Sequence, residues 1–186
     1  LPKNKVVGMA GILDTSRFIF FLSQELKIST NKIQSFVLGG HGDTMVAMTN
    51  HTKVDGQNLK NLIKKGLISQ EKIDFIINRT KKGGAEIVKY LEKGSAFYAP
   101  ASSGVEMAES YLKNLNKQLP CAAFLNGEYG VSNLYAGVPV IIGSEGVKKI
   151  IEIELDEEEK TNFKKSIKAV EELFNSAKKI DKDLSL

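Results

Sequence analysis

Cysteine and arginine are scarce in this sequence, and long uncharged runs are absent. With a single cysteine, Cys121, the chain cannot form an internal disulfide, so we expect a reducing, cytoplasmic setting. No uncharged run reaches the roughly 18–20 apolar residues that a membrane-spanning helix needs, so we expect no membrane partner. The 186 residues, of which 42% are hydrophobic, predict one globular domain that needs neither a metal site nor a disulfide for its core.

Arginine accounts for only two of the 26 basic residues, Arg17 and Arg79, and the others are lysine. The net charge of +4 favours an anionic partner, so a basic nucleic-acid-binding module is one interpretation, from a different class. The lysines, however, stand among apolar residues at helical spacing, which is typical of a solvated face, so we expect no nucleic acid as a partner. In this background an arginine indicates a position that needs a planar, two-pronged donor.

The spacing of apolar residues predicts helices and strands in separate blocks. After an irregular lead-in over 1–10, we expect helices over 11–26, 58–65, 70–93, 100–112 and from 156 onward, and strands over 33–38, 45–53, 121–125, 138–142 and 147–155. This order favours an α+β fold with a largely antiparallel sheet packed with long helices. The pair Gly83-Gly84 costs about 1 kcal/mol per glycine relative to alanine within a helix, so we expect a kink or the close approach of another backbone there.

A histidine between glycines is the sharpest chemical feature. Residues 39–43 (Gly-Gly-His-Gly-Asp) follow an apolar strand, so His41 projects from a tight turn with room for another group beside its ring. An imidazole gives and takes protons near neutral pH, which makes His41 a candidate general acid and base. On this motif alone, a turn histidine without a catalytic role remains the alternative. The second histidine, His51, lies in a polar segment and has no comparable setting.

A second candidate feature lies in the first expected helix. Asp14 and Arg17 are three residues apart, so both side chains stand on one face near the N-terminal end. They could form an exposed ion pair worth under about 1 kcal/mol. Alternatively, Asp14 orients a histidine while Arg17 holds a carboxylate through two parallel hydrogen bonds. The pair alone leaves both interpretations open.

Together, these two motifs and their spacing closely resemble the lactate/malate dehydrogenase family. The resemblance extends to residues 94–102, 119–123, 125–130 and 138–143, so it covers essentially the whole chain in order. Within the family, these segments resemble the malate dehydrogenases of lactate-dehydrogenase type. The resemblance implies the fold of the C-terminal domain of that family.

The resemblance also implies a reaction and roles for particular residues. It implies an NAD-dependent malate dehydrogenase, which interconverts malate and oxaloacetate by hydride transfer. His41 would be the general acid and base, Asp14 would bind its other ring nitrogen, and Arg17 would bind the carboxylate of a small dicarboxylate substrate.

Weaker assignments follow from the same resemblance. Ala96 would contribute to substrate binding, and Leu13 and Pro100 would lie beside the cofactor. Oligomers are usual in the family, so we expect a homo-oligomer, a dimer or a tetramer, with the helices over 11–26 and 70–93 at the interface.

The identity of the substrate depends on few positions. Gly40 favours malate, because lactate dehydrogenases usually have glutamate there. Ile19 stands where phosphate-regulated bacterial lactate dehydrogenases tend to carry a second arginine, which argues against control by sugar phosphates. A lactate or other 2-hydroxy acid dehydrogenase stays an alternative, since the family's specificity loop lies upstream of Leu1.

The dinucleotide-binding fingerprint is missing from these residues. No G-x-G-x-x-G follows a strand, and the segment over 8–11 is not a substitute. We therefore expect residues 1–186 to be the substrate-binding, catalytic C-terminal domain of a longer enzyme, with NAD bound mainly by an N-terminal domain ahead of Leu1. The 186 residues alone are then expected not to turn over malate.

Overall fold

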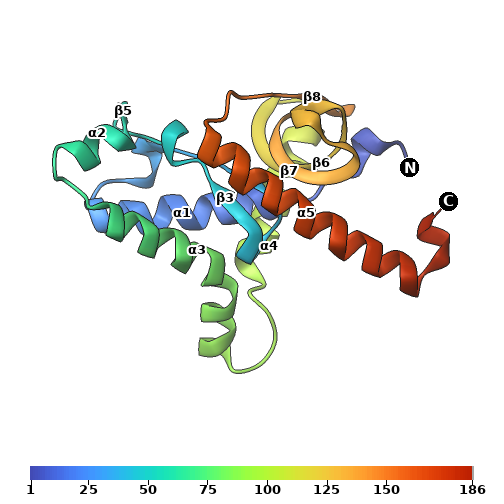
Figure 1. Cartoon of the computed structure of the whole chain (residues 1–186), viewed down its shortest axis with the longest axis horizontal. Coiled ribbons are helices and arrows are strands. Elements are labelled where there is room, and N and C mark those ends of the chain that lie inside the picture. The colour runs from blue at the N-terminus through green and yellow to red at the C-terminus, as the bar shows by residue number, and fades with distance from the viewer. Residues whose placement is uncertain (186) are drawn as a thin grey trace.

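Two long strands organise the main sheet of the computed structural model, which describes residues 1–185 (Figure 1). Strands β6 (Lys117–Asn126) and β7 (Ser132–Gly143) pair along their whole lengths, and β8 (Gly146–Ile150) returns along the end of β7. Strand β2 (Val37–Gly39) pairs with β7 and with β3 (Met45–Ala47), giving the order β3-β2-β7-β6. Every pairing is antiparallel, which confirms the expected sheet type.

A second, small sheet interrupts two of the expected strands. It contains β1 (Ile33–Gln34), β4 (Lys53–Val54) and β5 (Gln57–Asn58) in the order β1-β4-β5. The single strands expected over 33–38 and 45–53 are therefore wrong, because each one is divided between the two sheets. Polar side chains make the break: Thr52 donates a hydrogen bond to the backbone oxygen of Met48, and its hydroxyl lies 2.8 Å from that of Ser35.

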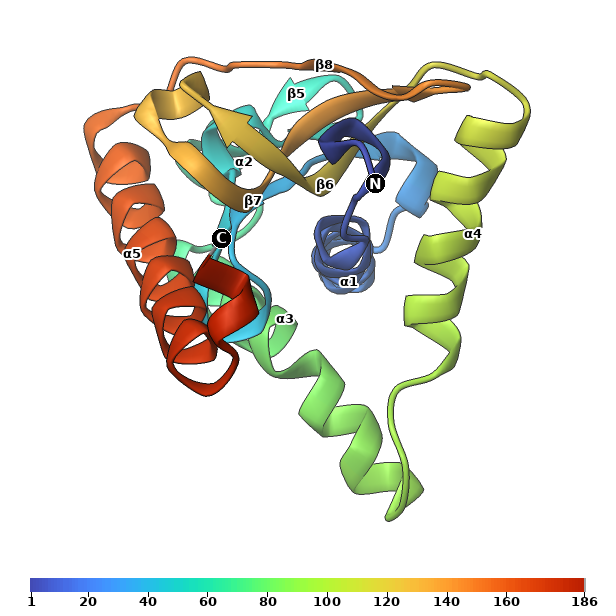
Figure 2. The same cartoon turned by 90° about the vertical axis from the view of Figure 1, so that its right-hand side faces the viewer.

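The five α-helices are close to their expected ranges. They are α1 (Ala10–Leu26), α2 (Leu59–Lys64), α3 (Gln70–Leu91), α4 (Tyr98–Leu112) and α5 (Glu157–Ile180). Figure 2 shows α1 nearly end-on beneath the main sheet, between α5 and α4. Pro100 lies in the first turn of α4, where its missing N–H removes no helical hydrogen bond. No helix among residues 1–185 is long and apolar enough to cross a membrane.

Helix α1 joins two hydrophobic cores. Its first turns place Ile12 in the core under the main sheet, together with Val138 and Phe163. Its later turns place Phe18 and Leu22 in a second core with the small sheet, α2 and α3. Both of these α1 side chains are fully buried. The helix is therefore fixed at both ends by packing, which matters because it also carries Asp14 and Arg17.

The last helix begins with a complete capping box. The Asp156 side chain accepts from the backbone N–H of Glu159, and the Glu159 side chain accepts from the backbone N–H of Asp156. The strand expected over 147–155 is shorter than predicted, because β8 ends at Ile150. Beyond that residue the Tyr129 hydroxyl donates to the Ile151 oxygen and accepts from the Ile153 N–H, which replaces strand pairing.

Helix α1 lies so close to β6 that only glycine fits at the contact. A Cβ at Gly11 would lie 2.8 Å from the backbone carbon of Pro120, and nearer still to its carbonyl oxygen. Both of these atoms belong to the backbone of β6, so neither can move without disturbing its pairing with β7.

Gly11→Ala should therefore lower the free energy of unfolding by about 1–3 kcal/mol, the usual cost of forcing extra volume into a packed interior. Urea unfolding followed by circular dichroism measures the change. Gly104→Ala is the matched control, because no atom lies within 4 Å of a Cβ at that helical position. It should stabilise by up to about 1 kcal/mol through helix propensity. Equal effects of the two substitutions would contradict the close contact.

Candidate active site

The structure brings His41, Asp14 and Arg17 together. The Nδ1 atom of His41 lies 2.8 Å from Oδ2 of Asp14, and Nη1 of Arg17 lies 3.4 Å from the other carboxylate oxygen. The Asp14 side chain is 1% exposed and that of Arg17 is 10% exposed, whereas that of His41 is 52% exposed. The interpretation of Asp14 and Arg17 as an exposed surface pair is therefore excluded. A buried carboxylate instead links an accessible imidazole to a guanidinium.

Asp14 holds the backbone of the turn as well as the ring. Its Oδ2 also accepts a hydrogen bond from the Gly42 N–H at 3.3 Å. The neighbouring Thr15 side chain accepts from the N–H of Val37 in β2 at 3.2 Å. Gly42 has φ +66°, a left-handed conformation that glycine adopts without strain. Consecutive residues of α1 thus fix both β2 and the turn that follows it.

The same carboxylate changes the proton affinity of His41. The hydrogen bond from the ring to Asp14 raises the pKa of His41 above its ordinary value of 6.5, and the negative charge of Asp14 adds to the rise. Partial burial and the positive charge of Arg17 act in the opposite direction and are the smaller influences overall. Asp14 therefore stabilises the imidazolium form, with Nδ1 occupied and the opposite ring nitrogen, Nε2, left for another partner.

Arg17 is packed against the glycine pair of α3. A Cβ at Gly83 would lie 3.0 Å from Cδ of Arg17, and one at Gly84 would lie 3.6 Å from Nη2. The approach that these glycines allow therefore comes from a side chain, not from another backbone as expected. Helix α3 also changes direction in its second half (Figure 1). Among residues 1–185, Nη1 is the only nitrogen of this guanidinium with a protein acceptor, and Nε is buried without one.

A cavity of about 400 Å³ adjoins Arg17 between α1, α3 and α4. Leu13, which the resemblance places beside the cofactor, lines this cavity together with Arg17. From α4 it is lined by Ala99, Ser102, Ser103 and Glu106, and not by the predicted Ala96 and Pro100. Ala96 is buried just ahead of α4, and Pro100 is partly buried one position from Ala99. The structure thus brings Leu13 to Arg17, and the roles of all three residues stay predictions.

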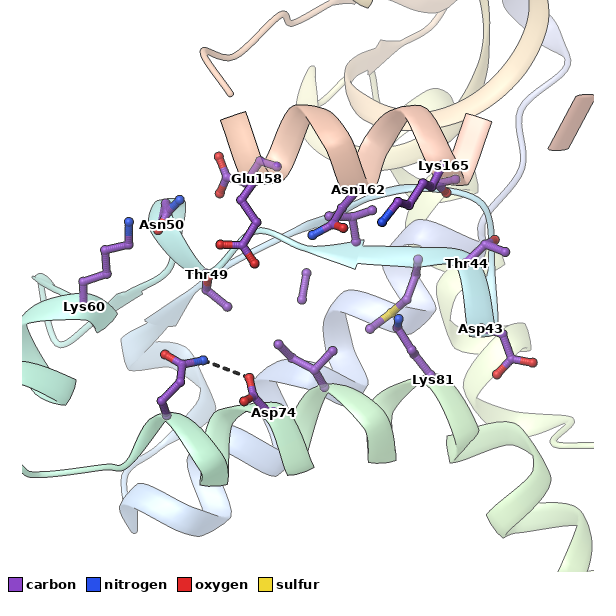
Figure 3. A pocket seen from close by; sticks show the side chains of 17 residues that line it. Asp43, Thr44, Thr49, Asn50, Lys60, Asp74, Lys81, Glu158, Asn162 and Lys165 are labelled. Carbon is purple, nitrogen blue, oxygen red and sulfur yellow. Dashed lines mark hydrogen bonds between the residues drawn. The ribbon is translucent and has the colours of Figure 1, made fainter. Parts of the chain in front are cut away.

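A larger cavity of about 680 Å³ lies on the other side of the turn (Figure 3). Figure 3 shows Glu158, Asn162 and Lys165 of α5 on one wall and Asp74 and Lys81 of α3 on the opposite wall. None of His41, Asp14 and Arg17 lines this larger cavity. The smaller cavity is lined by Arg17, whereas neither cavity is lined by His41 or Asp14. Within residues 1–185, no group of three or more His, Cys, Asp or Glu side chains is arranged to hold a metal ion.

Comparison with known proteins agrees with this geometry. Residues 12–182 match the family described as lactate/malate dehydrogenase, alpha/beta C-terminal domain. The chain belongs to the lactate/malate dehydrogenase family. This membership confirms the resemblance that the motifs indicate, and the structure confirms the antiparallel α+β domain that it implies.

Relatives within the lactate/malate dehydrogenase family are similar in sequence and in structure. The chain is 64% identical over 185 residues to a malate dehydrogenase of Pelagibacter ubique (strain HTCC1062), of which it covers 58%. The crystal structure of Cryptosporidium parvum malate dehydrogenase gives a TM-score of 0.93 at 42% identity, covering 96% of this chain and 57% of that one. Lactate dehydrogenase of Eimeria maxima, solved with NADH and oxamate, gives 0.93 at 41% identity, covering 97% and 56%. The chain therefore spans a little over half the length of these dehydrogenases.

Two contributors to the site were missed at the level of sequence. Gly83 was expected to allow a kink or the close approach of another backbone, and its role in making room for the Arg17 side chain was missed. Ser166 was not singled out, although its hydroxyl accepts the N–H of Gly40 next to His41. A serine beside the apolar stripe of Phe163 and Ile167 is a signal that could have indicated a buried polar contact.

His41 should titrate above its ordinary pKa of 6.5, and Asp14→Asn should bring its pKa down. Proton NMR of the imidazole signals measures both values, with His51 as an internal reference because the chain has only two histidines. Since the folded-state pKa is raised, the pair's contribution to stability is fully present below pH 6.5 and is lost as the pH rises through the folded-state pKa. An unchanged His41 pKa in folded Asp14→Asn would contradict the electrostatic coupling.

Proposed function

We propose that this chain is the catalytic part of an NAD-dependent malate dehydrogenase, which interconverts malate and oxaloacetate. The observation that carries the proposal is the constellation of an accessible His41, a buried Asp14 at 2.8 Å from its ring, and Arg17 beside a cavity. The similarity to the Pelagibacter ubique malate dehydrogenase supports it. Because the chain covers 58% of that relative, the proposal includes a second domain that binds the dinucleotide.

His41 moves the proton of the substrate's C2 oxygen. With Nδ1 held by Asp14, the opposite nitrogen accepts the hydroxyl proton of malate while a hydride leaves C2. In the reverse direction the imidazolium gives its proton to the carbonyl oxygen of oxaloacetate. The raised pKa of His41 increases the fraction of protonated ring that can give this proton. Asp14 fixes the tautomer and stabilises the cation, so it acts through the ring and does not touch the substrate.

Arg17 binds a substrate carboxylate. Its guanidinium is planar and offers several donors, and only Nη1 is engaged by a protein acceptor among the described residues. Asp14 and the wall formed by Gly83 hold the group in one orientation, which suits two parallel hydrogen bonds. A cavity of about 400 Å³ next to it has room for a small dicarboxylate.

The nicotinamide cofactor supplies the hydride acceptor or donor when it is bound. The described residues can supply only a small part of the contacts to this cofactor. Leu13 offers an apolar surface beside Arg17, and the half-exposed His41 ring is open to a reacting group. Ala96 and Pro100 remain proposed neighbours of the substrate and the nicotinamide. Most of the binding is assigned to the dinucleotide-binding domain.

Malate is proposed over lactate because of Gly40. A Cβ at this position would meet Oγ1 of Thr44 and would lie 3.3 Å from Val170. The glutamate usual in lactate dehydrogenases would therefore require Thr44 to move. Comparison of oxaloacetate with pyruvate as substrates decides between the two, and a preference for pyruvate would favour the lactate alternative.

We also propose a homo-oligomer, dimer or tetramer, in a reducing, cytoplasmic setting. Phe20 on α1 and Phe75 on α3 are more than half exposed, which supports an interface at these helices.

Burial raises the pKa of the Cys121 thiol to about 12, so this single cysteine is unreactive and contributes no cross-link.

In the two-domain enzyme, His41→Asn should lower the rate of oxaloacetate reduction by at least about 10³-fold while NADH still binds. Asparagine cannot give a proton to the carbonyl oxygen, and general acid catalysis alone is worth roughly 10²–10⁴-fold. Single-turnover absorbance at 340 nm measures the chemical step, and fluorescence titration measures NADH binding. His51→Asn is the matched control and should keep the normal rate. A near-normal rate for His41→Asn would refute the proposed function.

Arg17→Lys should weaken substrate binding and turnover together. An ammonium group retains the charge but loses the second, parallel hydrogen bond and the planarity, so kcat/KM should fall by about 10²-fold or more, or about 3 kcal/mol. Steady-state kinetics with oxaloacetate measure this fall, while the affinity for NADH should stay constant. Unchanged kinetics would show that Arg17 is not the carboxylate-binding group.

A further inference from the structure

The turn that carries His41 is also held by α5. Ser166 of α5 is 2% exposed, and its Oγ accepts a hydrogen bond of 2.8 Å from the backbone N–H of Gly40. We propose that Ser166 is a positioning residue, which fixes the backbone just before His41 so that the imidazole stays against Asp14. This inference rests on the proposed function, in which His41 carries the proton.

The turn lies directly against α5. Gly39 has φ +86°, and a Cβ there would lie 2.7 Å from Cβ of Ser166, with the hydroxyl oxygen closer still. A Cβ at Gly40 would lie 3.3 Å from Cγ2 of Val170, one turn further along α5. Gly39 is thus required because the backbone itself touches the helix, whereas at Gly40 the nearer obstacle is Oγ1 of Thr44. The contact leaves no space for water between the Gly40 amide and the serine.

The two hydrogen bonds around His41 come from opposite helices. The residue before it is bonded to Ser166 of α5, and the residue after it, Gly42, is bonded to Asp14 of α1. His41 itself is half-exposed, so its side chain has little packing to hold it. Its position therefore depends on these two backbone anchors and on the bond from Nδ1 to Asp14.

Helix α5 is a firm support for this anchor. Its N-terminus is fixed by the capping box, and the Asp156 side chain accepts a hydrogen bond from Asn50. On either side of Ser166, Phe163 and Ile167 are buried in the main core. Figure 3 shows Asn162 and Lys165 of the same helix facing the larger cavity, with Thr44 at one end of it. The serine hydroxyl is thus an acceptor whose place is set by the core, not by the turn.

The first test is the proton affinity of His41 in Ser166→Ala. Without an acceptor for the Gly40 N–H, the turn shifts and the contact between Nδ1 and Asp14 loosens. A close opposite charge raises a histidine pKa by about 1–3 units, so loosening should lower the pKa of His41 by about half a unit or more. Imidazole NMR measures it in the 186-residue chain.

Ser110→Ala is the matched control. Ser110 is also buried, donates to the backbone oxygen of Ile142 and accepts from the N–H of Lys117, far from His41 in the fold. It should cost stability without moving the pKa of His41. Should Ser166→Ala fail to fold, Ser166→Cys replaces it, since sulfur is only a weak acceptor of similar size. A folded Ser166 variant with the wild-type His41 pKa would overturn the proposal.

The second test separates positioning from a purely structural role. In the two-domain enzyme, Ser166→Ala should lower kcat about tenfold or more, because small misplacements of a reacting group are costly, and should change KM less than about threefold, because Arg17 is untouched. Equal kcat values in folded Ser166→Ala and wild type would overturn the positioning role. If His41→Asn keeps its rate while Ser166→Ala lowers the His41 pKa, the proposed function fails and the anchoring of the turn stands.

Discussion

A charged carboxylate lies almost completely inside the domain, and the arrangement of the neighbouring elements follows from it. The Asp14 side chain is 1% exposed. Removing such an ion from water costs several kcal/mol unless other groups replace the lost hydration. Three groups do so here: the His41 ring, the Gly42 amide and the Arg17 guanidinium. The turn after β2 and the first half of α1 therefore cannot separate without exposing an uncompensated charge.

Glycines allow the close contacts around α1 and the turn after β2. Toward the sheet, only a glycine at position 11 lets the helix approach the backbone of Pro120. Toward α3, Gly83 leaves room for the stem of Arg17. Gly137 of β7 allows the close approach of the backbone before the turn, since a Cβ at Gly137 would lie 2.6 Å from the carbonyl oxygen of Gly39. Glycines that reduce helix and strand propensity locally are thus placed where close contacts bring the charged groups together.

The sequence predicted the parts of this arrangement that depend on local chemistry. Spacing on one helix face placed Asp14 beside Arg17, and the glycine-flanked turn indicated an accessible His41. The long helices and the antiparallel sheet followed from apolar periodicity, since α1, α3 and α5 each bury one stripe. Propensity could not show that residues 33–38 divide between two sheets, because Thr52, far along the chain, decides the break. Nor could it show the bond between Ser166 and Gly40, which joins residues 126 positions apart.

The site combines two requirements that oppose each other. A group that exchanges a proton with a substrate has to be accessible, and accessible side chains in turns have few contacts to hold them. Here His41 is 52% exposed, while the groups that orient it, Asp14 and Ser166, are buried in two different helices. Because α1 and α5 are both fixed by the core under the main sheet, the precision of the imidazole comes from packing far from its reacting nitrogen. The hydrophobic core thus contributes to the chemistry as well as to stability, and a core substitution that shifts either helix should change the proton affinity of His41 before it unfolds the domain.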